Sequence, residues 1–139
     1  MLESDSPPIT EAFRVDLSIP GRAEFLGVVR LAIAGLCHRL GLDLGEAEDL
    51  KLAVTEACSQ CMQAPHLPDV LAISCEVDSD ELEITVLPTP ANEALFAPGG
   101  PAELGLFLIE ALVDEVEQLQ SPRGLRLTRR LTPTEDHEL

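Results

Sequence analysis

Two polar side chains, four residues apart, could carry acid–base or cation chemistry. Glu56 and Gln60 lie in the stretch Asp49–Gln60, and their spacing places both on one face of a helix. Glu56 follows an apolar run, and a carboxylate in such surroundings could act as a general base. Gln60 could bind a cation through its amide oxygen. The alternative is a Glu–Gln hydrogen-bonded pair on a solvated helix face.

A second pattern with chemical potential is the C-x-x-C formed by Cys58 and Cys61, which could be redox-active or supply half of a metal site. The pair lies in an apolar helical stretch, no second C-x-x-C exists, and His66 stands beyond a proline. With Cys37 and Cys75 the cysteines are too few for a disulfide scaffold. We interpret all of them as small buried thiols, and a metal- or redox-sensing module is the alternative.

Length and composition predict one domain. The chain has 139 residues, of which 45% are hydrophobic, so it can bury a core. We expect a single domain over residues 12–131, with flexible tails at 1–11 and 132–139. No run approaches the roughly 18 apolar residues of a membrane span, and the acidic N-terminus is unlike a signal peptide. A cytoplasmic protein without membrane partners is therefore expected.

The charge narrows the classes of partner. A formal net charge of −16 repels the phosphates of nucleic acid, and the chain has no Tyr or Trp on which bases could stack. A basic protein surface is the better candidate, because opposite charges steer association.

The elements that must position these residues follow from hydrophobic spacing. Alternation predicts strands at 13–19, 70–77 and 82–87, and a final hairpin turning at 121–124. Helical spacing predicts helices at 23–40, 45–62 and 102–116.

The order β-α-α-β-β-α-β-β predicts an α+β fold, a two-layer sandwich with helices on one face of a mixed, mostly antiparallel sheet. In the third helix the side chains expected to point inward are Leu104, Phe107, Leu108, Ala111 and Leu112.

Two long stretches of the chain resemble a known family. Ile19–Cys61, with Glu24–Leu31 and Glu48–Cys58 inside it, and Leu104–Val116 closely resemble the anti-sigma-factor serine kinases of the RsbW type. These belong to the GHKL (HATPase) superfamily, whose nucleotide site lies in a Bergerat-type α/β sandwich. The resemblance covers roughly residues 13–131.

This resemblance implies a bacterial regulator that keeps a sigma factor away from RNA polymerase. Its relatives are homodimers that use ATP and magnesium to phosphorylate a Ser or Thr of an anti-anti-sigma partner of the STAS type. Glu56 matches the family's catalytic acidic residue, and Gln60 stands where the family keeps an Asn that binds magnesium and phosphates. Gly105 matches a glycine that lets phosphates approach a helix start.

The family's partner-binding surface is also matched, at the opening of the first predicted helix. The residues assigned to it here are Arg22 and Arg30. Arg30 could pair with an acidic group of a partner through its planar fork. The alternative is a solvated arginine on an amphipathic helix.

Four departures from the family pattern fall on the nucleotide site. Gln60 is one methylene longer than Asn, which moves a ligand oxygen where magnesium tolerates little misplacement. Pro88-Thr89-Pro90 stands where relatives carry Asp-x-Gly, so no side chain receives the adenine amino group. Ala102-Glu103 replaces expected glycines with a carboxylate, and the loop at 88–101 is shorter than the usual nucleotide lid.

These departures predict an anti-sigma factor that sequesters its partner by binding, with ATP binding and kinase activity weak or lost. The alternative is an active serine/threonine kinase that binds ATP and magnesium through Gln60. In that case Asn92 or Glu93 could supply a compensating contact.

Overall fold

A computed structural model describes residues 12–63, 67–91 and 102–131. The tails expected at 1–11 and 132–139, as well as His66, Asn92 and Glu93, lie outside the described residues. The described elements run in the following order: β1 (Phe13–Pro20), a 3-10 turn (Ala23–Phe25), α1 (Leu26–Arg39), α2 (Leu44–Cys61), β2 (Val70–Asp78), β3 (Glu81–Thr89), α3 (Ala102–Leu112), β4 (Glu115–Gln120) and β5 (Arg123–Arg130).

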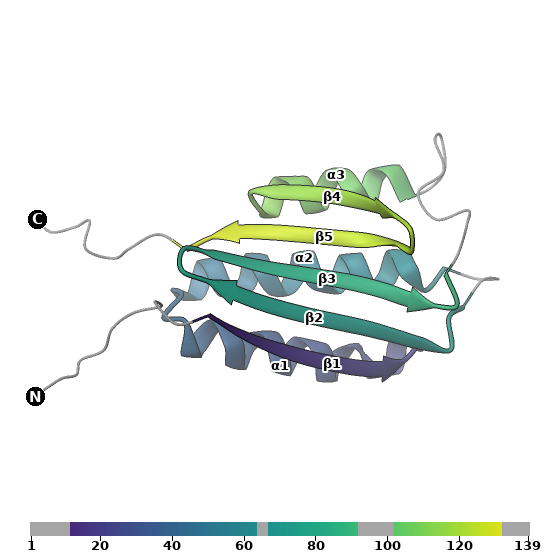
Figure 1. Cartoon of the computed structure of the whole chain (residues 1–139), viewed down its shortest axis with the longest axis horizontal. Coiled ribbons are helices and arrows are strands. Elements are labelled where there is room, and N and C mark those ends of the chain that lie inside the picture. The colour runs from purple at the N-terminus through teal and green to yellow at the C-terminus, as the bar shows by residue number, and fades with distance from the viewer. Residues whose placement is uncertain (1–11, 64–66, 92–101, 132–139) are drawn as a thin grey trace, which may run out of the picture.

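The strands form one five-stranded sheet in the order β1-β2-β3-β5-β4, with the three helices on one of its faces (Figure 1). This confirms the α+β sandwich. All four pairings are antiparallel, where the sequence led us to expect a mixed sheet. The reason is that β5 lies between β3 and β4, so the two strands that α3 connects run in the same direction without being neighbours.

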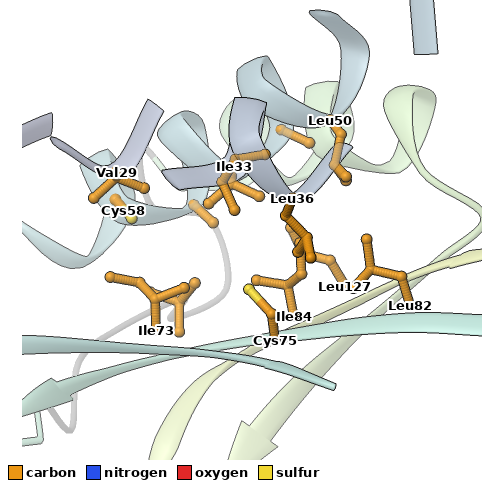
Figure 2. Packing of buried hydrophobic residues seen from close by; sticks show 14 of the residues in the cluster. Val29, Ile33, Leu36, Leu50, Cys58, Ile73, Cys75, Leu82, Ile84 and Leu127 are labelled. Carbon is orange, nitrogen blue, oxygen red and sulfur yellow. The ribbon is translucent and has the colours of Figure 1, made fainter. Parts of the chain in front are cut away.

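The core lies between the sheet and the helices (Figure 2). Alternate residues of β2 and β3 are buried against α1 and α2, and Ile73 faces Val86 across the two strands. Cys58 and Cys75 also lie in this cluster, as expected for buried thiols. Among the described residues, no helix is both long and apolar enough to cross a membrane.

The start of α2 is fixed by a reciprocal cap. The Asp43 carboxylate accepts a hydrogen bond from the Glu46 amide at 2.8 Å, and the Glu46 carboxylate accepts one from the Asp43 amide at 2.9 Å. Just before it, the turn that follows α1 contains Gly41, whose φ of +74° favours glycine, and the Leu42 amide donates to the Cys37 carbonyl at 3.1 Å. This turn and cap set where α2 begins, and so which of its residues face α3.

The third helix is rotated from the expected orientation. Leu104 and Phe107 are 77% and 70% exposed, and Leu108 and Ala111 are also exposed, so the expectation that they point inward was wrong. The buried stripe is instead Gly105, Ile109 and, just past the helix, Val113. A glycine on the inner stripe lets the backbone of α3 approach α2, and this contact decides which face of the helix turns inward.

Candidate functional site

Glu56 and Gln60 come together on the face of α2 that meets α3. Gln60 Nε2 donates a hydrogen bond to Glu56 Oε2 at 2.6 Å, across one helical turn. A carboxylate can only accept, so the amide nitrogen must be the atom that faces it. Glu56 is half-buried, and Gln60 is buried at 7% exposure. The hydrogen-bonded Glu–Gln pair that the sequence offered as an alternative is therefore present. It lies where α2 meets α3 and not on a solvated helix face.

Gly105 covers this pair. A Cβ atom at position 105 would lie 2.7 Å from Glu56 Oε2 and would also collide with the Gln60 amide, so only glycine fits here. The three residues that the resemblance assigned to the nucleotide site, Glu56, Gln60 and Gly105, are thus brought into direct contact.

One atom of the site has an unused bonding capacity. Gln60 Oε1 is buried and accepts no hydrogen bond from the residues that the structure describes. Buried carbonyl oxygens are rarely left without a donor, so this atom is suited to a water molecule or a cation. It is the acceptor through which Gln60 could hold a metal ion.

Pro88 and Thr89 are the last two residues of β3 instead of the start of a loop, and Pro90 follows the strand end. Pro88 lies opposite Leu71 in the register, and both are buried on the helix-facing side of the sheet. The Asp69 amide donates to the Thr89 carbonyl at 2.8 Å, which fixes the strand end. Residues 92–101 of the expected short loop lie outside the described residues, while Glu103 is exposed in the first turn of α3.

A second anchor holds α3 on α2 at the opposite end. Arg129 of β5 pairs with Glu46 Oε2 at 3.4 Å and donates to the Leu112 carbonyl at 3.4 Å. Because Glu46 opens α2 whereas Leu112 closes α3, the two helices run antiparallel. Arg129 was not among the site residues predicted from the sequence, where its alternation with Leu127 and Leu131 is the signal that it faces the helices.

The two arginines assigned to partner binding are exposed at the opposite flank of α2. The Arg22 guanidinium lies 5.3 Å from the centre of the Phe25 ring and 3.6 Å from Glu24. Arg30 is exposed on α1 and makes no ion pair with the described part of the chain. Both guanidinium groups are therefore accessible to a partner. They lie on different elements, since Arg22 directly precedes the 3-10 turn and Arg30 is within α1.

The cysteines are deeply buried. Burial raises the pKa of Cys61 to about 12 and that of Cys75 to about 11, and it also raises the pKa of Cys58 and Cys37. All four are free thiols. Within the described ranges, no three His, Cys, Asp or Glu side chains are grouped so that they could hold a metal ion. High pKa values keep these groups in the unreactive thiol form.

Comparison with known proteins places the chain in a family. Residues 19–131 match the histidine kinase-like ATPase domain. The chain is 31% identical over 121 residues to the serine-protein kinase RsbW of Bacillus cereus (strain Q1), covering 75% of this chain and 76% of that protein. It is 33% identical over 121 residues to the serine-protein kinase RsbW of Halalkalibacterium halodurans, covering 74% of each.

A solved structure shares the fold. The crystal structure of the RsbU and RsbW domains of Rv1364c from Mycobacterium tuberculosis superposes with a TM-score of 0.64 at 16% identity, over 85% of this chain and 31% of that longer chain. The family match spans most of the sequence and the architecture agrees with it. The chain therefore belongs to the histidine kinase-like ATPase (GHKL) family and is a member of its RsbW type.

Proposed function

We propose that this protein is an anti-sigma regulatory factor that sequesters a sigma factor by protein–protein binding and has weak or no ATP binding and kinase activity. The observation that carries the proposal is the seating of Gly105 on the Gln60–Glu56 pair. In this arrangement Gln60 engages one carboxylate oxygen of Glu56 and the backbone of Gly105 covers the pair, which leaves little room for a substrate hydroxyl to approach that oxygen.

The adenine side of the site supports the same proposal. Pro88 offers a buried ring where relatives place an acceptor carboxylate, and it lacks both a side-chain acceptor and an N–H donor. Loss of one charge-assisted hydrogen bond costs about 1.5–3 kcal/mol, or roughly ten- to a hundredfold in affinity. ATP and magnesium are thus weakly matched by the residues present.

One observation favours the second candidate function, an active serine/threonine kinase that phosphorylates an anti-anti-sigma partner of the STAS type. Gln60 Oε1 is a buried acceptor without a donor among the described residues, beside Glu56. An amide oxygen in this position could bind magnesium together with phosphate oxygens, and the relatives compared above are named serine-protein kinases. In this candidate Glu56 would be the catalytic base.

Calorimetric titration with ATP and magnesium separates the two candidates. We expect no saturable binding in the micromolar range for the natural chain. Gln60→Asn shortens the side chain by one methylene and should release Glu56, so affinity should rise. The matched control is Gln63→Asn, because Gln63 is an exposed glutamine just past the end of α2, where its Nε2 donates to the Ser59 carbonyl at 3.1 Å. Micromolar binding by the natural chain, with phosphate transfer abolished by Glu56→Ala, would establish the kinase instead.

The sigma factor is expected to dock on the α1 flank, where Arg22 and Arg30 are exposed. Pull-down from the source bacterium, followed by mass spectrometry, would identify the partner. Arg22→Ala and Arg30→Ala should weaken its capture, whereas Arg14→Ala, an exposed arginine on the other face of the sheet, should not. Equal capture by all the variants would refute this surface.

We further infer a cytoplasmic homodimer. Strand β1 is at the edge of the sheet and pairs only with β2 among the described strands, so its outer edge can pair with another chain. Light scattering across a broad concentration range should give twice the protomer mass. A constant mass of one protomer would contradict the dimer.

A further inference from the structure

We propose that the exposed face of α3, together with Leu52 of α2, is a docking surface for a basic amphipathic helix of a partner protein. This inference goes beyond the proposed function, since the surface is separate from Arg22 and Arg30. It concerns the four residues that the helical pattern wrongly placed in the core. They are Leu104, Phe107, Leu108 and Ala111.

The spacing of these residues forms a continuous apolar stripe. Positions 104, 107, 108 and 111 follow the i, i+3, i+4, i+7 rule, which places them along one side of the helix over two turns. Such a stripe is normally buried against another element. Here it is open, with Leu104 and Phe107 exposed by more than two thirds.

A neighbouring helix widens the stripe. Gly105 contacts Glu56, and the Leu112 carbonyl shares Arg129 with Glu46, so α3 and α2 lie side by side and antiparallel. Leu52 precedes Glu56 by one helical turn and is therefore on the same side of α2, between these two contacts. It is half exposed, which extends the apolar surface from α3 onto α2.

The rim of this surface is acidic. Helix α3 contains Glu103 and Glu110 and has no Lys or Arg. On α2 the neighbouring charges are Glu48, Asp49 and Glu56, and Lys51 is held by Glu48 at 2.7 Å. An apolar stripe with negative flanks is complementary to a helix that has an apolar face and Lys or Arg beside it.

The same rim argues against a second copy of this chain as the occupant. In a two-fold symmetric contact the acidic residues would face each other, and like charges at an interface oppose association. The α1 flank has the opposite charge. Residues 22–39 contain three arginines, Arg22, Arg30 and Arg39, and one acidic residue, Glu24. Figure 1 shows α2 between α1 and α3, so the two helix surfaces lie on opposite flanks of one molecule and suit partners of opposite charge.

The test uses the full chain and a synthetic amphipathic peptide of about 18 residues built from Leu and Lys, which forms about five helical turns. Nuclear magnetic resonance titration should give saturable shifts centred on α3 and Leu52. A matched peptide with Glu in place of Lys should cause none. Raised salt should weaken the binding of the Lys peptide, and Glu110→Gln should reduce this salt dependence.

Matched variants separate docking from general attraction to an acidic protein. Leu104→Ser should weaken peptide binding at least tenfold, whereas Leu31→Ser should change it by less than about twofold. Leu31 is 75% exposed on α1, compared with 77% for Leu104, so both variants should remain folded, as melting curves will verify. Phe107→Ser provides a second test of the surface.

Two kinds of result would overturn the proposal. One is equal weakening by Leu104→Ser and Leu31→Ser, or shifts centred away from α3, which would mean unspecific binding. The other is a dimer in which α3 amides are protected and which Leu104→Ser dissociates, because the surface would then serve a second copy. Neither result bears on ATP binding, so failure here is distinguishable from failure of the proposed function.

Discussion

The backbone of Gly105 rests against the carboxylate of Glu56, so that a Cβ atom at position 105 would stand 2.7 Å from Glu56 Oε2. This contact joins α3 to α2 at the residues that define the candidate nucleotide site. It also fixes the rotation of α3, which determines the face that the helix shows to solvent.

Gly105→Ala should destabilise the protein by about 1–3 kcal/mol, because the added methyl group must displace Gln60, Glu56 or the helix itself. The matched control is Gly35→Ala on α1, where no atom lies within 4 Å of the added Cβ. That change should stabilise by about 0.5–1 kcal/mol, since alanine is the better helix former. Urea unfolding of both variants tests the contrast, and equal effects would contradict the close approach.

Glu56→Ala should cost about 1–3 kcal/mol of unfolding free energy, because it leaves the buried Gln60 amide without its acceptor. The double variant Glu56→Ala with Gln60→Leu should recover much of this loss, since neither polar group then remains unpaired. Glu48→Ala, an exposed carboxylate on the same helix, should stay within about 0.5 kcal/mol. Additive effects in the double variant would argue against a coupled pair.

Arg129→Ala should destabilise by about 1–3 kcal/mol, because Arg129 bridges Glu46 and the Leu112 carbonyl in a largely buried position. Arg14→Ala removes contacts to Asp16 and Glu76 that are more than half exposed, and it should cost less than about 1 kcal/mol. Thermal unfolding of the two variants should rank them in this order. The reverse order would show that Arg129 does not anchor α3.

Stability should fall as the solution becomes alkaline. Burial raises the pKa of Cys61 from 9.0 to about 12 and that of Cys75 from 9.0 to about 11, so the folded chain keeps protons that the unfolded chain releases. The contribution of these thiols is fully present below about pH 9 and is lost as the pH rises toward 11–12. Each thiol adds a slope of about 1.4 kcal/mol per pH unit in that window.

Urea unfolding between pH 7 and 10 measures this slope, and Cys61→Ala should reduce it. Thiol reagents should react with the native chain no faster than it opens, since all four cysteines are buried. A rapidly reacting cysteine in the folded state would contradict the burial.

Hydrophobic spacing was sufficient to predict the eight elements, their order and the sandwich. Apolar residues recur at every second position in the strands and at every third or fourth position in the helices. The ends were less accurate. The third helix stops at Leu112 instead of 116, since Asp114 turns back to accept a hydrogen bond from the Arg130 amide at 2.6 Å. The β3 strand includes Pro88 and Thr89. A proline is tolerated near the end of a strand, and the Thr89 carbonyl there accepts a hydrogen bond from the Asp69 amide.

The sequence by itself placed Glu56 and Gln60 on one helix face, since four residues make about one turn, and its resemblance to a family added Gly105. The sequence could not decide which side of α3 turns inward, because both sides of that helix are apolar and either could pack against the core. Tertiary structure made this choice through the close approach at Gly105 and the Arg129 bridge. Contacts between distant segments therefore determined both how Glu56 is held and why Leu104 and Phe107 face solvent.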